Sequence, residues 1–254
     1  MTRRSTFVRG LFAATMLAAF TCATLADEID DVRAAKKVRV AIDLGSPPFG
    51  MTDASMNATG SDVETARLLA KDLGVELEIV QTTGANRIPF LQTGKADLVI
   101  SSLSVTPERE KVIDFSTPYA QIQSVVAGPK TIAIRSFSDL AGKRVATARG
   151  TTNDRLATEG AKGAQIVRFD DDATLITAIA SGQVEIAATS PALIKAIRDS
   201  APQRDIEVKF VMSSFPLGIG MRKGEPKLQA WINDWIQAKS ANGQLATIQK
   251  KFHG

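Results

Sequence analysis

The sequence has few residues of the kinds that bind metals or form covalent cross-links. It contains a single cysteine, Cys22, and a single histidine, the penultimate His253, among 254 residues. One cysteine cannot form an internal disulfide, and one histidine cannot build the His and Cys cluster of a zinc site. We therefore expect no metal and no cofactor, and we expect His253 to be solvated at the end of the chain.

The chain also lacks an excess of charge of one sign. Its formal net charge of +4 includes Arg3, Arg4 and Arg9, and without these three the remaining 28 basic side chains face 27 acidic ones. A nucleic-acid-binding protein needs a clustered basic face, so this balance argues against that class. With 44% hydrophobic and 23% charged residues, the composition is that of an ordinary globular protein.

The first 26 residues have the three parts of an export signal. The three arginines form a basic start, Leu11 to Phe20 form a short apolar core, and Thr24-Leu25-Ala26 supplies small residues for a cleavage site. A membrane anchor is the alternative, but spanning a bilayer takes about 20 apolar residues and this run is about half as long. We therefore predict a signal peptide at residues 1–26, cleaved near Ala26, and a periplasmic mature chain that begins near Asp27.

The rest of the chain alternates between strand and helix patterns in two successive series. The first series has predicted strands at 38–43, 75–80 and 96–100 and helices at 61–73 and 88–93. The second has strands at 144–148, 166–169 and 184–188 and helices from about 153 and at 173–180. The spacing of Ser61 and Glu64 predicts a capping box at the start of the first helix. Such alternation indicates mainly parallel sheets flanked by helices, with ligands beyond the carboxyl ends of the strands.

The last segment carries one apolar stripe at helical spacing. The stripe consists of Leu228, Trp231, Ile232, Trp235 and Ile236. Aromatic side chains of this kind can stack on sugars, but their position in a single stripe favours packing in a core. We therefore expect both tryptophans to be core residues.

Several short segments, taken together and in this order, are similar to a known family. They are Val38 to Asp43 with Pro47-Pro48-Phe49, Leu91 to Asp97, Ser104 to Arg109, Ile113 to Tyr119, Asp139 to Val145, and Gly150-Thr151-Thr152. Each segment alone is weak evidence. Over nearly all of the mature chain, the set resembles the periplasmic amino-acid-binding proteins of bacterial ABC importers, solute-binding protein family 3.

The resemblance implies an α/β protein with the two-lobed periplasmic-binding-protein fold of type II. Each lobe would be a mainly parallel sheet flanked by helices, and two hinge strands near residues 119–123 and 213–217 would join the lobes. Lobe 1 would comprise residues 27–120 plus 217–254, and lobe 2 residues 121–216. The implied partners are a small-molecule ligand and the membrane permease of an ABC importer, and we expect a monomer.

A free amino acid needs fixed donors for its carboxylate, an acceptor for its ammonium and a shaped pocket. The resemblance makes Arg109 the carboxylate partner, a role that suits a guanidinium because it forms two parallel hydrogen bonds. Thr151 and Thr152 lie at a predicted helix start, where free N–H groups attract an anion. Ser102 and Ser104 follow a strand end and would donate from lobe 1.

The remaining candidates bear on the ammonium and on selectivity. The resemblance places Asp43 at the ligand ammonium, although it could instead only fix its own loop. Arg87 matches the arginine that meets the side-chain carboxylate in glutamate and aspartate binders, or else it is a solvated residue at a helix start. The family's second-lobe aspartate aligns with Thr189, which can only hydrogen-bond. Two positions that are often aromatic in the family are Ser46 and Gly84 here.

These observations predict a binding protein without catalytic residues, which captures a polar amino acid or amino-acid-like ligand, with an acidic one favoured, and delivers it to an ABC permease. The alternative is a periplasmic enzyme similar to cyclohexadienyl dehydratase on the same fold. That enzyme needs a cleft carboxylic acid, which Thr189 does not provide. A sensor that delivers its ligand to a receptor is a third possibility with the same binding chemistry.

Overall fold

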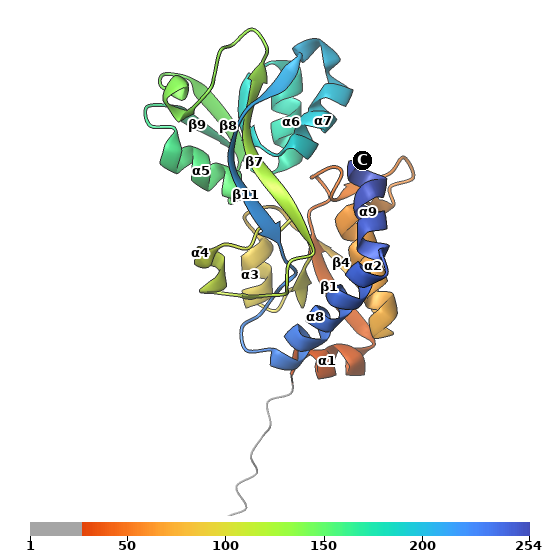
Figure 1. Ribbon diagram of the computed structural model, residues 1–254. Helices are drawn as coiled ribbons and strands as arrows, with labels where there is room; N and C mark the ends of the chain where they lie inside the picture. Colours follow the sequence, from red (N-terminus) through yellow and green to blue (C-terminus); the bar gives the residue numbers. More distant parts are fainter. Residues whose placement is uncertain (1–26) are drawn as a thin grey trace, which may run out of the picture.

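The computed structural model describes residues 27–254 and consists of two α/β lobes connected by two long strands (Figure 1). The predicted signal peptide at 1–26 lies outside the described residues. The two-lobed α/β architecture expected from the sequence is confirmed, and most of the predicted helices and strands lie within a few residues of their expected bounds.

Lobe 1 is built on a sheet with the strand order β4-β1-β5-β12-β6. Its strands are β1 (Lys37–Ile42), β4 (Glu76–Gln81), β5 (Leu98–Val99), β6 (Asp114–Phe115) and β12 (Gly220–Met221). The first three are parallel, whereas β12 is antiparallel to both of its neighbours. The helices of this lobe are α1 (Glu28–Ala35), α2 (Ser61–Leu73), α3 (Arg87–Gln92), α4 (Pro107–Glu110), α8 (Pro226–Ala241) and α9 (Gln244–His253). A short hairpin of β2 (Met51–Thr52) and β3 (Ala58–Thr59) precedes α2.

Lobe 2 has the strand order β11-β7-β10-β8-β9. Its strands are β7 (Ala120–Pro129), β8 (Arg144–Ala148), β9 (Gln165–Phe169), β10 (Ile186–Thr189) and β11 (Ile206–Leu217). Again three strands, β8, β9 and β10, are parallel, and the two that connect the lobes are antiparallel. The helices are α5 (Thr152–Gly160), α6 (Asp172–Ser181) and α7 (Pro191–Ser200). Each sheet is therefore mixed, because strands that enter from the other lobe add to the parallel set.

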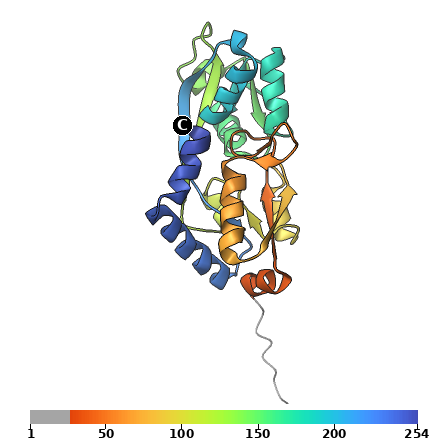
Figure 2. The same ribbon diagram turned by 90° about the vertical axis from the view of Figure 1, so that its right-hand side faces the viewer.

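The strands β7 and β11 run side by side between the lobes (Figures 1 and 2). Their register extends from the pair Ala120 and Leu217 to the pair Pro129 and Ile206. The two polypeptide connections thus support each other through paired backbone, with irregularities between Val208 and Phe210 and between Val211 and Ser213. The residue limits proposed for the lobes, 27–120 plus 217–254 and 121–216, stay a prediction.

The C-terminal stripe packs as expected. Trp235 is 6% exposed and its indole Nε1 donates to Asp72 Oδ2 at 2.8 Å. Trp231 is partly buried against the same core cluster, which joins α1, α2, α8 and α9 to the sheet of lobe 1. Among the described residues, the helices are all too short or too polar to cross a bilayer.

Two local predictions are wrong. The N-cap of α2 is Gly60 rather than Ser61, because Gly60 adopts a φ of +125° that carries the chain into the helix, so no capping box forms. His253 is half-buried and not fully solvated. It lies in the last turn of α9, its Nε2 is 3.0 Å from Ser61 Oγ, and its ring centroid is 4.7 Å from that of Phe49. Burial lowers the pKa of His253.

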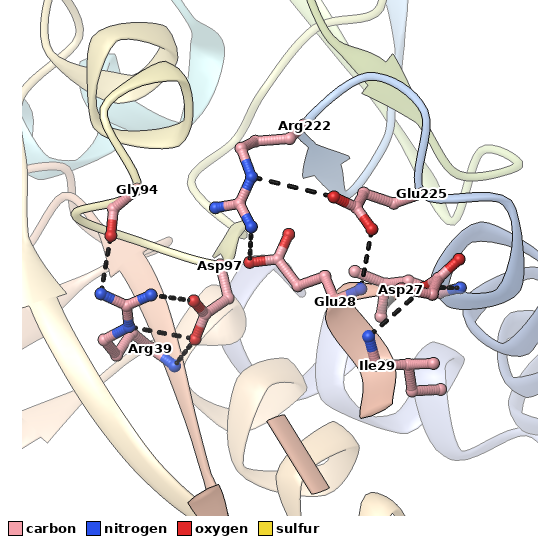
Figure 3. Close-up of polar contacts among 9 residues, drawn as sticks. Asp27, Glu28, Ile29, Arg39, Gly94, Asp97, Arg222 and Glu225 are labelled. Atoms are coloured by element: carbon pink, nitrogen blue, oxygen red, sulfur yellow. Dashed lines mark hydrogen bonds and ion pairs between the residues drawn. The ribbon is translucent and has the colours of Figure 1, made fainter. Parts of the chain in front are cut away.

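A polar cluster ties the start of the described chain to the C-terminal part of lobe 1 (Figure 3). The side chain of Asp27 accepts hydrogen bonds from the backbone N–H groups of Ile29, Lys227 and Leu228, so one carboxylate caps both α1 and α8. Beside it, Glu28 is 3% exposed and pairs with Arg222 at 2.5 Å. Desolvation by burial, opposed by Arg222 and reinforced by nearby Asp97, raises the pKa of Glu28 to about 8.

Candidate functional site

A pocket lies between the lobes, at the carboxyl ends of the parallel strands. Its lining combines lobe 1 (Asp43, Ser46, Phe49, Gly84, Arg87, Ser102, Ser104), the strand β7 (Ile122, Ser124) and lobe 2 (Ala148, Thr151, Thr152, Asn153, Asp172, Ser190, Leu193). Six of the eight predicted site residues line it: Asp43, Arg87, Ser102, Ser104, Thr151 and Thr152. These six residues thus lie together in one pocket, and their binding roles remain predictions.

On the side of lobe 1, the pocket is formed by the chain just after β1 and β5. Asp43 is 8% exposed and its Oδ1 accepts a hydrogen bond from Gly45 N at 2.9 Å. Burial raises its pKa. Ser102 has a φ of +41°, and its backbone N–H donates to Asp62 Oδ2 at 2.8 Å. Asp62, whose pKa burial raises to about 7, also accepts from the Tyr119 hydroxyl at 3.4 Å, so one hidden carboxylate connects the pocket to the beginning of β7.

Arg87 lies inside the pocket and not in solvent. Its side chain is buried, with Nη1 donating to Ser101 O at 2.8 Å and Nε to Gly84 O at 3.2 Å. Burial lowers its pKa, an effect opposed by the carboxylates of Asp43, Asp172 and Asp62. The solvated-arginine alternative is therefore wrong.

The second lobe presents the beginning of α5 to the pocket. Thr151 caps this helix, because its hydroxyl accepts from Asp154 N at 3.1 Å while donating to Ala148 O at 2.8 Å. Thr152, 8% exposed, has its Oγ1 3.4 Å from Ser104 Oγ of lobe 1. The first turn of a nine-residue helix thus lines the pocket, a setting that favours a negative group.

Arg109 sits beside the pocket, in a neighbouring hollow that shares Thr151 and Thr152 with it. Its Nη1 donates to Ser104 O at 2.9 Å and its Nη2 to Gly150 O at 3.3 Å. Burial lowers its pKa to about 9, which leaves it charged at neutral pH. In this closed arrangement Arg109 therefore connects the two lobes directly.

Thr189 does not line the pocket. It is fully buried at the end of β10, and within the described part of the chain its hydroxyl has no hydrogen-bond partner. The next residue, Ser190, lines the pocket instead. The acid nearest to it along the chain, Glu185 just before β10, is exposed and lines a separate hollow of lobe 2.

The acid that lobe 2 does contribute is Asp172, which the sequence reasoning missed. It is the first residue of α6, and its Oδ2 accepts a hydrogen bond from Ser46 Oγ of lobe 1 at 2.7 Å. Burial raises its pKa to about 6, and the neighbouring carboxylate of Asp43 acts in the same direction. Its position in the short turn between the strand 165–169 and the predicted helix at 173–180 was the signal available in the sequence.

The two positions that lack an aromatic side chain, Ser46 and Gly84, are places where the lobes touch. Ser46 Oγ donates to Asp172 of lobe 2, and a Cβ on Gly84 would lie 2.9 Å from Arg149 O. At a further lobe contact, a Cβ on Gly150 would lie 2.7 Å from Ala85 Cα. Only glycine permits these approaches of backbone to backbone. Within residues 27–254, no group of three or more acidic or imidazole side chains has the arrangement of a metal site.

Comparisons with known proteins identify chains of similar sequence and fold. A model of the bacterial extracellular solute-binding proteins, family 3, matches residues 38–254. The L-cystine-binding protein TcyJ of Escherichia coli is 28% identical over 250 residues, covering 96% of this chain and 94% of that protein. The glutamine-binding protein GlnH of Bacillus subtilis is 30% identical over 209 residues, covering 80% and 76%.

Among solved structures, the ancestral amino acid-binding protein AncCDT-1, a precursor of cyclohexadienyl dehydratase, matches with a TM-score of 0.81 at 32% identity. The match covers 89% of this chain and the whole of that one. The fold is therefore that of a known group of proteins.

Proposed function

Because this chain belongs to family 3 of the bacterial extracellular solute-binding proteins, we propose that it captures an amino acid between its lobes and delivers it to the permease of an ABC importer. Export of the chain, with removal of the predicted signal at residues 1–26, is part of the proposal. The relatives named above are an L-cystine-binding protein and a glutamine-binding protein, which supports an amino-acid ligand here.

One observation carries the proposal: the cleft pairs groups of opposite charge at separate positions. Arg109 and the beginning of α5 meet near Ser104 and suit an α-carboxylate. The carboxylates of Asp43 and Asp172 lie in the adjoining pocket, which shares Thr151 and Thr152 with the hollow of Arg109, and suit an ammonium. A zwitterion satisfies both sets at once, and each lobe supplies part of each set, so ligand contact stabilises the closed form.

The charge of the ligand's side chain is a separate question. Arg87 is the basis for expecting an acidic one. However, two donors of Arg87 already serve backbone carbonyls, and Asp43 and Asp172 lie close to it. An acidic ligand side chain would add negative charge beside Asp43 and Asp172, whereas an uncharged side chain would not. The pocket thus supports an uncharged side chain at least as well as the acidic one.

Isothermal titration calorimetry of the mature protein with L-glutamate and with L-glutamine tests whether an amino acid binds and whether its side chain is acidic or uncharged. The protein is first unfolded and refolded, so that a ligand retained during purification does not mask binding. Binding of either amino acid, or of another in a full panel, supports the proposal, and the ratio of the two affinities decides the charge of the side chain. Failure of every amino acid to bind would overturn the proposal.

A catalytic role requires a carboxylic acid that protonates a leaving group in the cleft. The AncCDT-1 match and the raised pKa of Asp172 are what would favour a dehydratase. The relatives named above are binding proteins, which supports binding without turnover. If the protein formed phenylpyruvate from prephenate in an activity assay, it would be an enzyme and not only a binding protein.

A further inference from the structure

Two carboxylates of the cleft belong to different lobes and approach each other across it. Asp43 follows β1 in lobe 1, and Asp172 begins α6 in lobe 2. The hydrogen bond from Ser46 Oγ to Asp172 Oδ2, 2.7 Å long, joins the two lobes at this point, and Gly45 lies against Ala173. Opening of the lobes would separate the two acids, so their proximity is a property of the closed form.

The charged groups around Asp172 do not neutralise this pair. Asp43 faces it from the loop after β1, Arg87 from α3, and Asp171 from α6 itself. Arg87 is the single cation among these groups, and it is shared with Asp62 on α2. Negative charge therefore exceeds positive charge at this point of the empty closed cleft, in a setting where water is partly excluded and repulsion is strong.

We propose that Asp172 is a specificity-determining residue that makes closure depend on a cation. With both acids ionised, closure needs a positive group between the lobes: the ammonium of a bound amino acid, or a proton on the carboxylate of Asp172 itself. Closure driven by the ligand ammonium rests on the proposed function, since the ammonium is that of the captured ligand. Closure driven by a proton on Asp172 requires no ligand and is tested without one.

The expected size of the proton effect follows from linkage. In an open, solvated state Asp172 would titrate near its ordinary pKa of 3.8, whereas burial in the closed form raises that pKa to about 6. The closed form thus binds the proton more tightly, and acidification favours closure. Between pH 7.5 and pH 5 the ratio of closed to open empty protein should rise about tenfold. Asp43, whose pKa burial also raises, acts in the same direction.

The test measures the distance between the lobes in the empty, refolded mature protein. Because the mature chain has no cysteine of its own, Lys71→Cys and Lys162→Cys place one spin label on each lobe for double electron–electron resonance. The same pair is made in Asp172→Asn, which retains the acceptor for Ser46 but removes the charge. Asp170→Asn, two residues away on an exposed side chain, is the matched control.

The proposal expects the closed distance to gain population in the wild type as the pH falls from 7.5 to 5. It expects Asp172→Asn to be enriched in the closed distance already at pH 7.5, by roughly a hundredfold in the closed-to-open ratio, with a smaller change on acidification than the wild type. The control should follow the wild type. Wild-type distances that do not change with pH, or an Asp172→Asn protein as open as the wild type, overturn it. The wild-type series alone decides if Asp172→Asn does not fold. Failure of all amino acids to bind would instead overturn the proposed function.

Discussion

Replacement of Glu28 by glutamine should make the protein more stable in alkaline solution while changing little in acid. Glu28 is buried beside Asp97, and its Oε2 has no hydrogen-bond partner among the described residues. Its pKa is 4.5 in the unfolded chain and about 8 in the folded one. The folded state therefore retains a proton that the unfolded state releases, so this contribution to stability is fully present below pH 4.5 and is lost as the pH rises through about 8.

The two pKa values determine how much the unfolding free energy changes with pH. Linkage between them gives a loss of about 4 kcal/mol from pH 5 to pH 9, since each pKa unit is worth about 1.4 kcal/mol. Glutamine cannot ionise, and its amide can still accept from Arg222 and donate toward Asp97. The difference in unfolding free energy between Glu28→Gln and the wild type should therefore increase by about 3–4 kcal/mol over this range, in favour of the variant.

Urea unfolding at pH 5, 7 and 9, followed by circular dichroism, measures this difference. The control is Glu78→Gln, which removes an exposed ion pair with Lys37 in the same lobe and should run parallel to the wild type. If the Glu28→Gln and wild-type curves are parallel from pH 5 to pH 9, Glu28 does not hold a proton in the folded state and the reasoning is refuted.

Three further predictions concern the cleft and the core. Arg109→Ala should abolish ligand-induced stabilisation, about 2.7 kcal/mol at 100 times the dissociation constant, in a thermal-shift assay, and unchanged binding would exclude Arg109 as the carboxylate partner. Gly150→Ala should weaken binding about tenfold or more by calorimetry, because its Cβ would meet Ala85 on closure, with Gly142→Ala, where nothing lies near, as the control. Trp235→Ala should lower the unfolding free energy by about 3–5 kcal/mol in urea titrations, and a loss below about 1 kcal/mol would contradict its core position.

The sequence predicted the parts of the fold that depend on local pattern. Helical spacing placed Trp235 in a core, and strand patterns located β1 and β8, because periodicity reflects which face of an element is buried. His253 was misjudged since its burial comes from Phe49, which is distant along the chain. Gly60 was missed as the cap of α2 because the start of that helix is determined by the backbone dihedral of Gly60. No side chain caps the helix there, so the sequence carries no signal for it.

The residues of the candidate site also fall into those that the sequence pattern predicts and those that depend on how the lobes pack. Residues at strand ends, such as Asp43 and Ser102, were predictable because the carboxyl ends of parallel strands gather at one edge. The contribution of Asp172 was not, because it depends on how the second lobe lies against the loop containing Ser46. Alignment with a family pattern directed attention to Thr189, whose side chain is buried away from the pocket.

The glycines at the cleft determine how the protein can discriminate among ligands. Gly84 and Gly150 allow backbone from one lobe to touch backbone from the other, where a larger side chain would instead form a wall around the ligand. Of the residues that line the pocket, Phe49 is the one aromatic, and the lining is otherwise rich in hydroxyl and charged groups. A hydrophobic wall distinguishes ligands by shape, whereas buried charges and hydroxyls reject any ligand that leaves them unpaired. Selectivity in this cleft should therefore depend more on the ligand's charge and hydrogen-bonding groups than on its shape.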